Sequence, residues 1–349
     1  QDSGAAHRFV GTHRDGLVVI DPHGDLVNQL LTLVPVARRD DILLMDLADT
    51  SYPVALNPLD ALFGRDRDKA VESLLGVLAQ IWSKFWGPRM QNALEYALKT
   101  LYEANETLVA RDPQHGPDQQ FTVLDVAPIL SAPGFRRDVL SLTQDQALRT
   151  WWTHYYQPLD FRLQLEIINP VLTKIAAFSG SRVARRIVGQ SRSTLDLGAI
   201  VRAGQVLLVN TAKGVVGAET STLIGATLLG ALQSSLEEQG RLAPEARRQF
   251  LTIIDEFQTL LGVDYAALLS ELRKFGGTFA LATQTLAHLD ALDATLRPTT
   301  LANVDALYTF AVSAEDARTL ARELDEAITP TDLINLDDFH CYAKLTLAG

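Results

Sequence analysis

Two adjacent acids, Asp255 and Glu256, follow a run of apolar and β-branched residues in QFLTIIDEFQTLL, residues 249–261. An aspartate at the carboxyl end of a strand can hold a water of a magnesium shell. The glutamate after it can orient and deprotonate a water that attacks a γ-phosphate. Two acids that simply end a strand, with Asp255 capping the next helix, would give the same pattern. The pair alone leaves both interpretations open.

Two further residues near this pair could take part in phosphate chemistry. Gln284 ends the stretch TFALATQ, 29 residues after Asp255, and we expect this strand to lie beside the first one. A glutamine in that place can sense a γ-phosphate. Between the strands, the helix YAALLSELRKFGG ends in Arg273 and Lys274, just before two glycines. Arg273 is either a favourable cation at a helix C-terminus or an arginine finger that reaches the nucleotide of a neighbouring subunit.

The segment DPHGD, residues 21–25, brings two aspartates and a histidine close together. Such a cluster could suggest a metal site. Pro22 and Gly24, however, are typical of a turn between a strand and a helix. We therefore interpret Asp21 and His23 as residues that shape the turn or support a neighbouring site, rather than as metal ligands.

Two segments are candidates for contact with DNA phosphates, which requires little more than cations. Residues 174–193 carry five cations and no acid: Lys174, Arg182, Arg185, Arg186 and Arg192. The loop TAKGVVGAE, residues 211–219, carries Lys213, but its lysine precedes the glycine, so it is not a phosphate-binding loop. A solvated helix face paired with acids elsewhere explains the first segment equally well.

Four tryptophans fall in the helical part of the chain. Trp82 and Trp86 are four residues apart on one expected helix face and could stack on bases. We expect them instead to pack within the helical part, as we do for Trp151 and Trp152.

Composition sets the limits within which these residues must act. The 349 residues are 47% apolar and 21% charged, as in a globular protein, and are too many for one ordinary core. The formal charge of -11 argues against a surface that coats nucleic acid, but allows a small basic patch or a pore lining. The single cysteine, Cys341, excludes an internal disulfide framework.

The elements that must position these side chains follow an α/β pattern. Apolar strands are expected at 16–21, 41–46, 205–210, 249–255, 278–283, 306–312 and 340–347, with amphipathic helices such as 219–239 and 314–324 between most of them. Residues 66–195 show helical periodicity and little strand signal. The pattern predicts an α/β core with a mainly parallel sheet, whose parts are residues 1–65 and 199–349, and an inserted all-α domain at 66–198.

Several stretches in this order resemble the HerA/FtsK-type hexameric DNA translocases, in particular the TraG/TraD-type coupling ATPases of conjugation and type IV secretion, and HerA-like helicases. They are VVIDPHGDLV, LNPLD, WGPRMQNAL, VLLVNTAKGVVG, IIDEFQTL, ELRKFGG, LATQTLAHL and NVDALYTFAVSAEDARTLAREL. The resemblance covers nearly the whole chain. It implies a RecA-like P-loop NTPase core, ATP and Mg²⁺ as cofactors, and a ring of six subunits that moves DNA through its centre.

The resemblance also assigns roles to single residues. Asp255 and Glu256 become the Walker B pair, with Asp255 as the metal-binding residue, and Gln284 becomes a sensor glutamine. Arg273 is the best candidate for a finger acting in trans. Asp21 and His23 come to lie near the nucleotide, while Lys213 and the arginines of 182–186 are the candidate DNA contacts.

One element of the family is missing from the sequence. No G-x-x-x-x-G-K-[ST] loop occurs in the 349 residues, and Gly4 and Gly11, before the first strand, are not followed by lysine and serine or threonine. The loop could precede residue 1, could belong to sequence not included here, or could be lost. We favour the first two, and so expect an ATP-driven DNA translocase whose present chain alone hydrolyses ATP poorly.

The alternative is a non-catalytic ring scaffold or docking module derived from such an ATPase. In either case the expected partners are DNA, further copies of the chain, and relaxase or secretion-system proteins. The expected location is the cytoplasm, at the inner face of the cell membrane, with any membrane anchor outside this chain.

Overall fold

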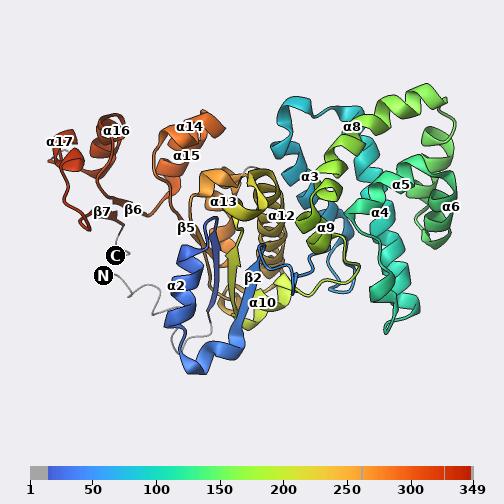
Figure 1. Ribbon diagram of the computed structural model, residues 1–349, viewed down its shortest axis with the longest axis horizontal. Coiled ribbons are helices and arrows are strands. Elements are labelled where there is room, and N and C mark those ends of the chain that lie inside the picture. The colour runs from blue at the N-terminus through green and yellow to red at the C-terminus, as the bar shows by residue number, and fades with distance from the viewer. Residues whose placement is uncertain (1–14, 261, 326, 347–349) are drawn as a thin grey trace.

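The computed structural model describes residues 15–260, 262–325 and 327–346, and its centre is a parallel sheet of five strands (Figure 1). The strands are β1 (Gly16–Asp21), β2 (Ile42–Asp46), β3 (Val206–Asn210), β4 (Phe250–Ile254) and β5 (Gly277–Leu281). Their order in the sheet is β2-β3-β1-β4-β5, and every pair is parallel. All five carboxyl ends therefore lie at one edge of the sheet.

The strands form because their side chains are buried on both faces. Every residue of β1 is buried. Leu17 and Val19 point to one face and join the small apolar cluster of helix α2 (Asp25–Leu33), while Val18 and Ile20 point to the other face and join the main core. This alternation is the period-two pattern of a strand covered on both sides.

The main core lies between the sheet and the helices that pack on one of its faces. Helix α12 (Ala218–Glu237) buries 13 of its residues, and α10 (Leu197–Ala203) packs against both α12 and β1. Helix α13 (Tyr265–Glu271) adds Tyr265 and Leu268 to the same core.

Every regular element that the structure describes between β2 and β3 is helical. The α-helices are α3 (Arg67–Ile81), α4 (Pro88–Arg111), α5 (Val126–Ser131), α6 (Pro133–Leu142), α7 (Gln146–Thr150), α8 (Phe161–Gly180), α9 (Arg182–Val188) and α10. Several begin at residues whose side chains accept a hydrogen bond from the first turn, as Asp66, Asp160 and Ser181 do. Helix α3 packs on α12 and so joins the helical part to the sheet core. The division at residues 66 and 198 stays a prediction.

The tryptophans divide into two pairs. Trp151 and Trp152 are buried in the helical part, where Trp152 Nε1 donates to Thr100 Oγ1 over 2.8 Å, as the packing prediction requires. Helix α3, however, ends at Ile81, so Trp82 and Trp86 do not share a helix face as the sequence suggested. Both are only partly buried against the core.

The last two strands do not extend the parallel sheet. Strands β6 (Ala306–Thr309) and β7 (Tyr342–Leu345) pair antiparallel in a separate two-stranded sheet. Every residue of β1 is buried, whereas three of the four residues of β6 are not. Strand β6 is therefore not covered on both faces as the strands of the parallel sheet are. Helices α14 (Ala287–Leu292), α15 (Leu296–Asn303), α16 (Ala314–Leu324) and α17 (Pro330–Ile334) complete this end of the chain. Among the helices described, none has the length and apolar character needed to cross a bilayer.

Candidate active site

The turn after β1 is built around the buried carboxylate of Asp21, which is 1% exposed. Its Oδ1 accepts a hydrogen bond from the His23 amide over 2.8 Å, and its Oδ2 accepts one from the Val27 amide over 3.1 Å. Gly24 adopts a φ of 89°, and a Cβ there would lie 2.7 Å from Asn210 Nδ2. The turn thus needs glycine at this position and holds His23 at the carboxyl edge of the sheet.

The acidic pair lies at the same edge, directly after β4. Glu256 has a φ of 42° and a ψ of 49°, a left-handed conformation that a residue with a Cβ seldom adopts. The Glu256 amide donates to Asp255 Oδ1 over 3.0 Å, and the Asp255 amide donates to the Ile20 carbonyl over 3.0 Å. A strained backbone held in this way directs the Glu256 side chain toward the neighbouring strand ends.

Both carboxylate oxygens of Glu256 are held by residues from other turns. His23 Nε2 lies 3.1 Å from Oε2, and Gln284 Nε2 donates to Oε1. Because a carboxylate only accepts hydrogen bonds, the neutral His23 must carry its proton on Nε2. The Glu256 side chain is 16% exposed, against 51% for His23. The carboxylate is therefore fixed in direction while one side of the group stays open to solvent.

Asp255 lies among other negative charges. Burial raises the pKa of its carboxyl group, and the charges of Asp21 and Glu256 raise it further, whereas the Glu256 amide and His23 act in the opposite direction. No described residue donates a hydrogen bond to Asp255 Oδ2. A cation beside this oxygen would relieve the repulsion among the three carboxylates.

The turn after β3 contributes residues that the sequence analysis missed. Asn210 Nδ2 donates to Asp46 Oδ1 over 3.2 Å, and the Thr211 amide donates to the Asp21 carbonyl over 2.9 Å. Thr211 Oγ1 accepts from Ser221 over 2.8 Å and is fully buried. The signal was present, since VLLVNT passes from an apolar strand to polar residues as GLVVID does.

Lys213 follows this turn and begins the short helix α11 (Lys213–Val216). Its amide donates to the Pro22 carbonyl over 2.9 Å, which ties the loop to the turn of His23. Close by in the fold, Thr220 Oγ1 donates to Ser181 Oγ over 3.0 Å, at the start of α9. The structure thus brings the segment of Lys213 next to the helix that carries Arg182, Arg185 and Arg186.

The three arginines of α9 are exposed, and Arg186 donates to the Thr50 carbonyl over 3.2 Å. Lys174, which the sequence grouped with them, is only 7% exposed as a whole residue. Most of its side chain is covered while its Nζ still reaches solvent, which the sequence could not reveal.

Arg273 is not brought to the acidic pair. It lies in the short turn Leu272–Phe275 before β5, at the amino end of that strand, and is 77% exposed. Its Nη1 donates to Asp305 Oδ2 over 2.7 Å. The amino end of β5 and the carboxyl end of β4 are at opposite edges of the sheet, so Arg273 cannot reach Glu256 of its own chain.

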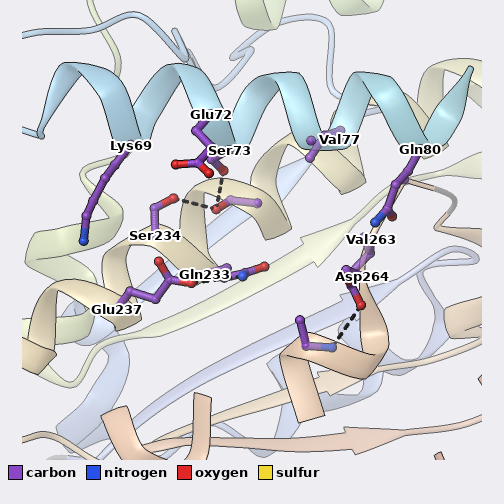
Figure 2. Close-up of a pocket in the computed structure, with 14 residues that line it drawn as sticks. Lys69, Glu72, Ser73, Val77, Gln80, Gln233, Ser234, Glu237, Val263 and Asp264 are labelled. Carbon is purple, nitrogen blue, oxygen red and sulfur yellow. Dashed lines mark hydrogen bonds between the residues drawn. The ribbon is translucent and has the colours of Figure 1, made fainter. Parts of the chain in front are cut away.

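A cavity of about 400 Å³ lies away from this edge, between α3, α12 and the start of α13 (Figure 2). Its polar side chains mostly serve the fold: Ser73 donates to the Gly230 carbonyl over 3.0 Å, and Asp264 caps α13 by accepting from Ala267. None of the candidate site residues lines it. The chemistry-bearing side chains are instead gathered on the open carboxyl edge. Nor do the described residues include a group of three or more acids, histidines or cysteines that could hold a metal ion.

Comparison with known proteins gives the fold. Neither a protein family model nor a curated protein sequence matches the chain. Among solved structures it is similar to the unbound bacterial conjugative coupling protein TrwBdeltaN70, with a TM-score of 0.66 and 14% identity over 95% of this chain and 75% of that one. TrwB bound to a non-hydrolysable ATP analogue gives 0.65 and 14%, covering 96% and 76%.

A second similar structure is VirB4 of Thermoanaerobacter pseudethanolicus, with a TM-score of 0.60 and 14% identity over 96% of this chain and 82% of that one. At this identity the likeness concerns the fold. The α/β fold with a parallel sheet, and the resemblance to the fold of coupling proteins, are thereby confirmed.

Proposed function

We propose that the chain is the motor part of an ATP-driven DNA translocase of the conjugation and type IV secretion kind. The observation that carries the proposal is the carboxylate of Glu256, held between His23 and Gln284 at the carboxyl edge of the sheet. In open α/β sheets, ligands bind outside the carboxyl ends of the strands. The similarity to TrwB, a coupling protein with structures bound to nucleotide analogues, supports this choice of function.

In this proposal Glu256 accepts the proton of the attacking water. A general base must point at that water, and the hydrogen bonds from His23 and Gln284 fix its direction. Gln284 also carries an amide that can exchange its bond with Glu256 for one with a phosphate oxygen. It would thereby link the presence of a γ-phosphate to the state of the base.

Asp255 is the residue that would hold magnesium, directly or through water. The site fits Mg²⁺ because Asp255 Oδ2 accepts no hydrogen bond from the described residues, and this ion is commonly held by one or two carboxylates together with water and substrate phosphates. Bound Mg²⁺ neutralises charge that develops on the phosphates during transfer. Asp21 and His23 would support the same site from the turn after β1.

Arg273 completes the proposed site from another copy of the chain. Its place at the opposite edge, 77% exposed, suits a finger that reaches a neighbour rather than its own Glu256. A ring of six copies would bring the amino edge of one sheet to the carboxyl edge of the next. Lys213, Arg182, Arg185 and Arg186 would contact the DNA backbone without regard to sequence, at the inner face of the cell membrane.

A second candidate function is a non-catalytic ring scaffold or docking module for relaxase or secretion proteins. The observation that favours it is the absence of a G-x-x-x-x-G-K-[ST] loop from the 349 residues. Residues 1–14, with Gly4 and Gly11, lie outside the described part of the structure. These 349 residues hold the water-activating half of a nucleotide site, so we expect them to hydrolyse ATP slowly by themselves.

The two functions are separated by DNA-stimulated ATP hydrolysis in the natural full-length protein, with Glu256→Gln beside it. The motor predicts activity that falls at least ~10²-fold in the variant, since a positioned general base contributes that much or more. Glu245→Gln is the matched control, because Glu245 is an exposed acid in the turn Pro244–Ala246 before β4, at the opposite end of that strand from Glu256. Equal activity in the wild type and Glu256→Gln would remove Glu256 from the mechanism, and no activity in either would support the scaffold.

A further inference from the structure

Lys174 and Phe85 form an unusual contact on the helical part of the molecule. Lys174 is 7% exposed, and its Nζ lies 5.9 Å from the centroid of the Phe85 ring. Among the residues that the structure describes, none gives this ammonium a carboxylate partner or a hydrogen-bond acceptor. The Nζ of Lys174 is not among the fully enclosed side-chain atoms that lack a partner, so the ammonium reaches solvent beside the ring. It can therefore pair with the phosphate of a ligand.

Phe85 is exposed in a way that its neighbours are not. Its side chain is 74% exposed, whereas Trp82 and Trp86 on either side are partly buried against the core. The short turn Ser83–Phe85 is closed by a bond of 2.9 Å from the Phe85 amide to the Trp82 carbonyl, and Trp86 Nε1 donates to Gln91 Oε1 over 2.8 Å. Phe85 is thus a solvent-facing ring on an anchored turn, with a cation on one side.

The two segments that meet at this contact contain no acid. Residues 73–94, which include Phe85, and residues 167–195, which include Lys174, hold no aspartate or glutamate, although the chain has a formal charge of -11. Their cations are Lys84, Arg89, Lys174, Arg182, Arg185, Arg186 and Arg192. Among the described residues only Arg192 of this set pairs with an acid, Asp118 at 4.0 Å, so the other six cations leave a local excess of positive charge that attracts a polyanion.

The cations continue from this contact toward the carboxyl edge of the sheet. Helix α8, which carries Lys174, packs against α9 with its exposed arginines (Figure 1). Helix α8 ends at Gly180, six residues after Lys174, and Arg182 begins α9 directly after the extended residue Ser181. The bond between Ser181 and Thr220 then joins the start of α9 to the start of α12, next to the loop of Lys213.

We propose that Phe85 and Lys174 bind single-stranded nucleic acid, with a base stacked on the open face of the Phe85 ring and a phosphate beside the Lys174 ammonium. An aromatic ring next to cations is the arrangement that binds single strands without sequence preference. In a duplex the bases are already stacked on each other and cannot occupy the ring. The inference rests on the proposed function for the class of partner, and it assigns that partner an entry point on the helical part.

The test is direct binding of a fluorescently labelled oligothymidylate, measured by anisotropy without nucleotide, so that the result does not depend on ATP hydrolysis. We expect Phe85→Ala to weaken binding about tenfold, as for the loss of one stacked base, and Phe85→Trp to retain it. Phe161→Ala is the matched control, because Phe161 lies on α8 and is 75% exposed. It should bind like the wild type.

Lys174 is tested by the salt dependence of binding. Removing one phosphate contact to a single strand should reduce the slope of log K against log salt by about 0.7 in Lys174→Gln. Lys174→Arg should keep the slope, and thermal unfolding shows whether each variant is folded. Because Phe85 is exposed, its variants test the site even if Lys174→Gln does not fold.

Three results would overturn the inference. The first is equal affinity of the wild type, Phe85→Ala and Phe161→Ala. The second is a duplex that binds as tightly as the single strand and loses as much affinity with Phe85→Ala. The third is a wild-type protein that binds no oligonucleotide. Binding is measured without ATP, so a protein without ATPase activity can still bind the oligonucleotide through Phe85. The two assays therefore distinguish failure of this inference from failure of the proposed function.

Discussion

The two edges of the parallel sheet are chemically different. At the carboxyl edge, turns that are far apart in the sequence place Asp21, His23, Glu256 and Gln284 together, and the last three are joined by hydrogen bonds. At the amino edge, Arg273 stands exposed and pairs only with Asp305 on the surface. The first edge holds a carboxylate between an imidazole and an amide, and the second presents an exposed arginine held by a surface ion pair.

Under the proposed function, this difference makes the site of one chain incomplete. Strands β4 and β5 run parallel in register from Phe250 and Gly277 to Ile254 and Leu281. Five residues of strand span ~16 Å, too far for an arginine at one end to contact a carboxylate beyond the other. In the proposed mechanism, an anionic transition state at the carboxyl edge would take its cation from elsewhere, and we propose the amino edge of a second copy as its source.

Of the changes considered, removing the Arg273 side chain should lower kcat the most. If Arg273 is a finger in trans, Arg273→Ala lowers kcat about 10³-fold in the assembled protein. Arg318→Ala is the control, since Arg318 is also exposed and pairs with Glu315 over 3.2 Å. Steady-state ATPase assays decide the matter. A kcat for Arg273→Ala equal to that of Arg318→Ala would mean that Arg273 is only a favourable cation at a helix C-terminus and not a finger.

The next largest effect concerns the direction of Glu256. His23→Ala removes the hydrogen bond to Oε2, and we expect a fall in kcat of roughly tenfold with little change in KM, because a misdirected base slows chemistry more than binding. His23→Gln, which retains a side-chain N–H donor, should recover most of the activity.

His115 provides the control for His23. It lies 3.1 Å from Asp112 in an exposed pair much like that of His23 and Glu256, but far from the sheet edge. His115→Ala should leave kcat unchanged. If His23→Ala raises KM and spares kcat, His23 contacts the nucleotide instead of orienting the base.

Breaking the ion pair between Arg273 and Asp305 should change both the stability and kcat only slightly. Asp305→Asn breaks an exposed ion pair, which contributes at most about 1 kcal/mol to folding. We expect kcat to stay within about fivefold of the wild type, because that is the most that about 1 kcal/mol could change the rate if all of it appeared in the activation free energy. Denaturant unfolding and ATPase assays check both points. A loss as large as that of Arg273→Ala would mean that the ion pair itself is the functional unit.

The smallest expected effect is a change in thermal stability on replacing Asp255, whose carboxyl group has a raised pKa. Because the pKa is above its ordinary value of 3.8 in the folded state, the protein loses stability as the pH rises through the folded pKa. Asp255→Asn cannot ionise, so we expect its Tm at pH 7 to exceed that of the wild type slightly. The difference should shrink below pH 3.8.

Asp293 gives a contrast of opposite sign. Hydrogen bonds from the side chain and amide of Thr295 lower the pKa of Asp293, so its ionised form favours folding. Asp293→Asn should therefore lower Tm at neutral pH. Thermal unfolding across pH measures both variants, and a Tm for Asp255→Asn below that of the wild type at pH 7 would contradict the electrostatic account of the carboxyl edge.

Much of the sheet could be predicted because its strands are apolar along their whole length. All five strands of the parallel sheet lie within two residues of the predicted ranges, and β5 pairs with β4 as expected. The separate sheet of β6 and β7 was not predicted. Their apolar content signals a strand, but which strand pairs with which depends on contacts that periodicity does not contain.

The site was predictable only in part, for a similar reason. Asp255, Glu256 and Gln284 stand next to recognisable strands, whereas the contact between His23 and Glu256 joins residues 233 positions apart. The left-handed backbone of Glu256 and the burial of Lys174 are also products of the tertiary fold. Local sequence shows the types of side chain available, and packing decides which of them meet.

Mixing two inactive variants tests most directly whether the edges of different copies form one site. Glu256→Gln and Arg273→Ala, each nearly inactive alone, would be combined in equal amounts under conditions in which subunits exchange. Half of the sites then keep the glutamate, and half of those face an intact arginine, so activity should recover to roughly a quarter of the wild-type value in a symmetric ring. Activity no higher than that of the two variants measured separately would contradict a site shared between copies.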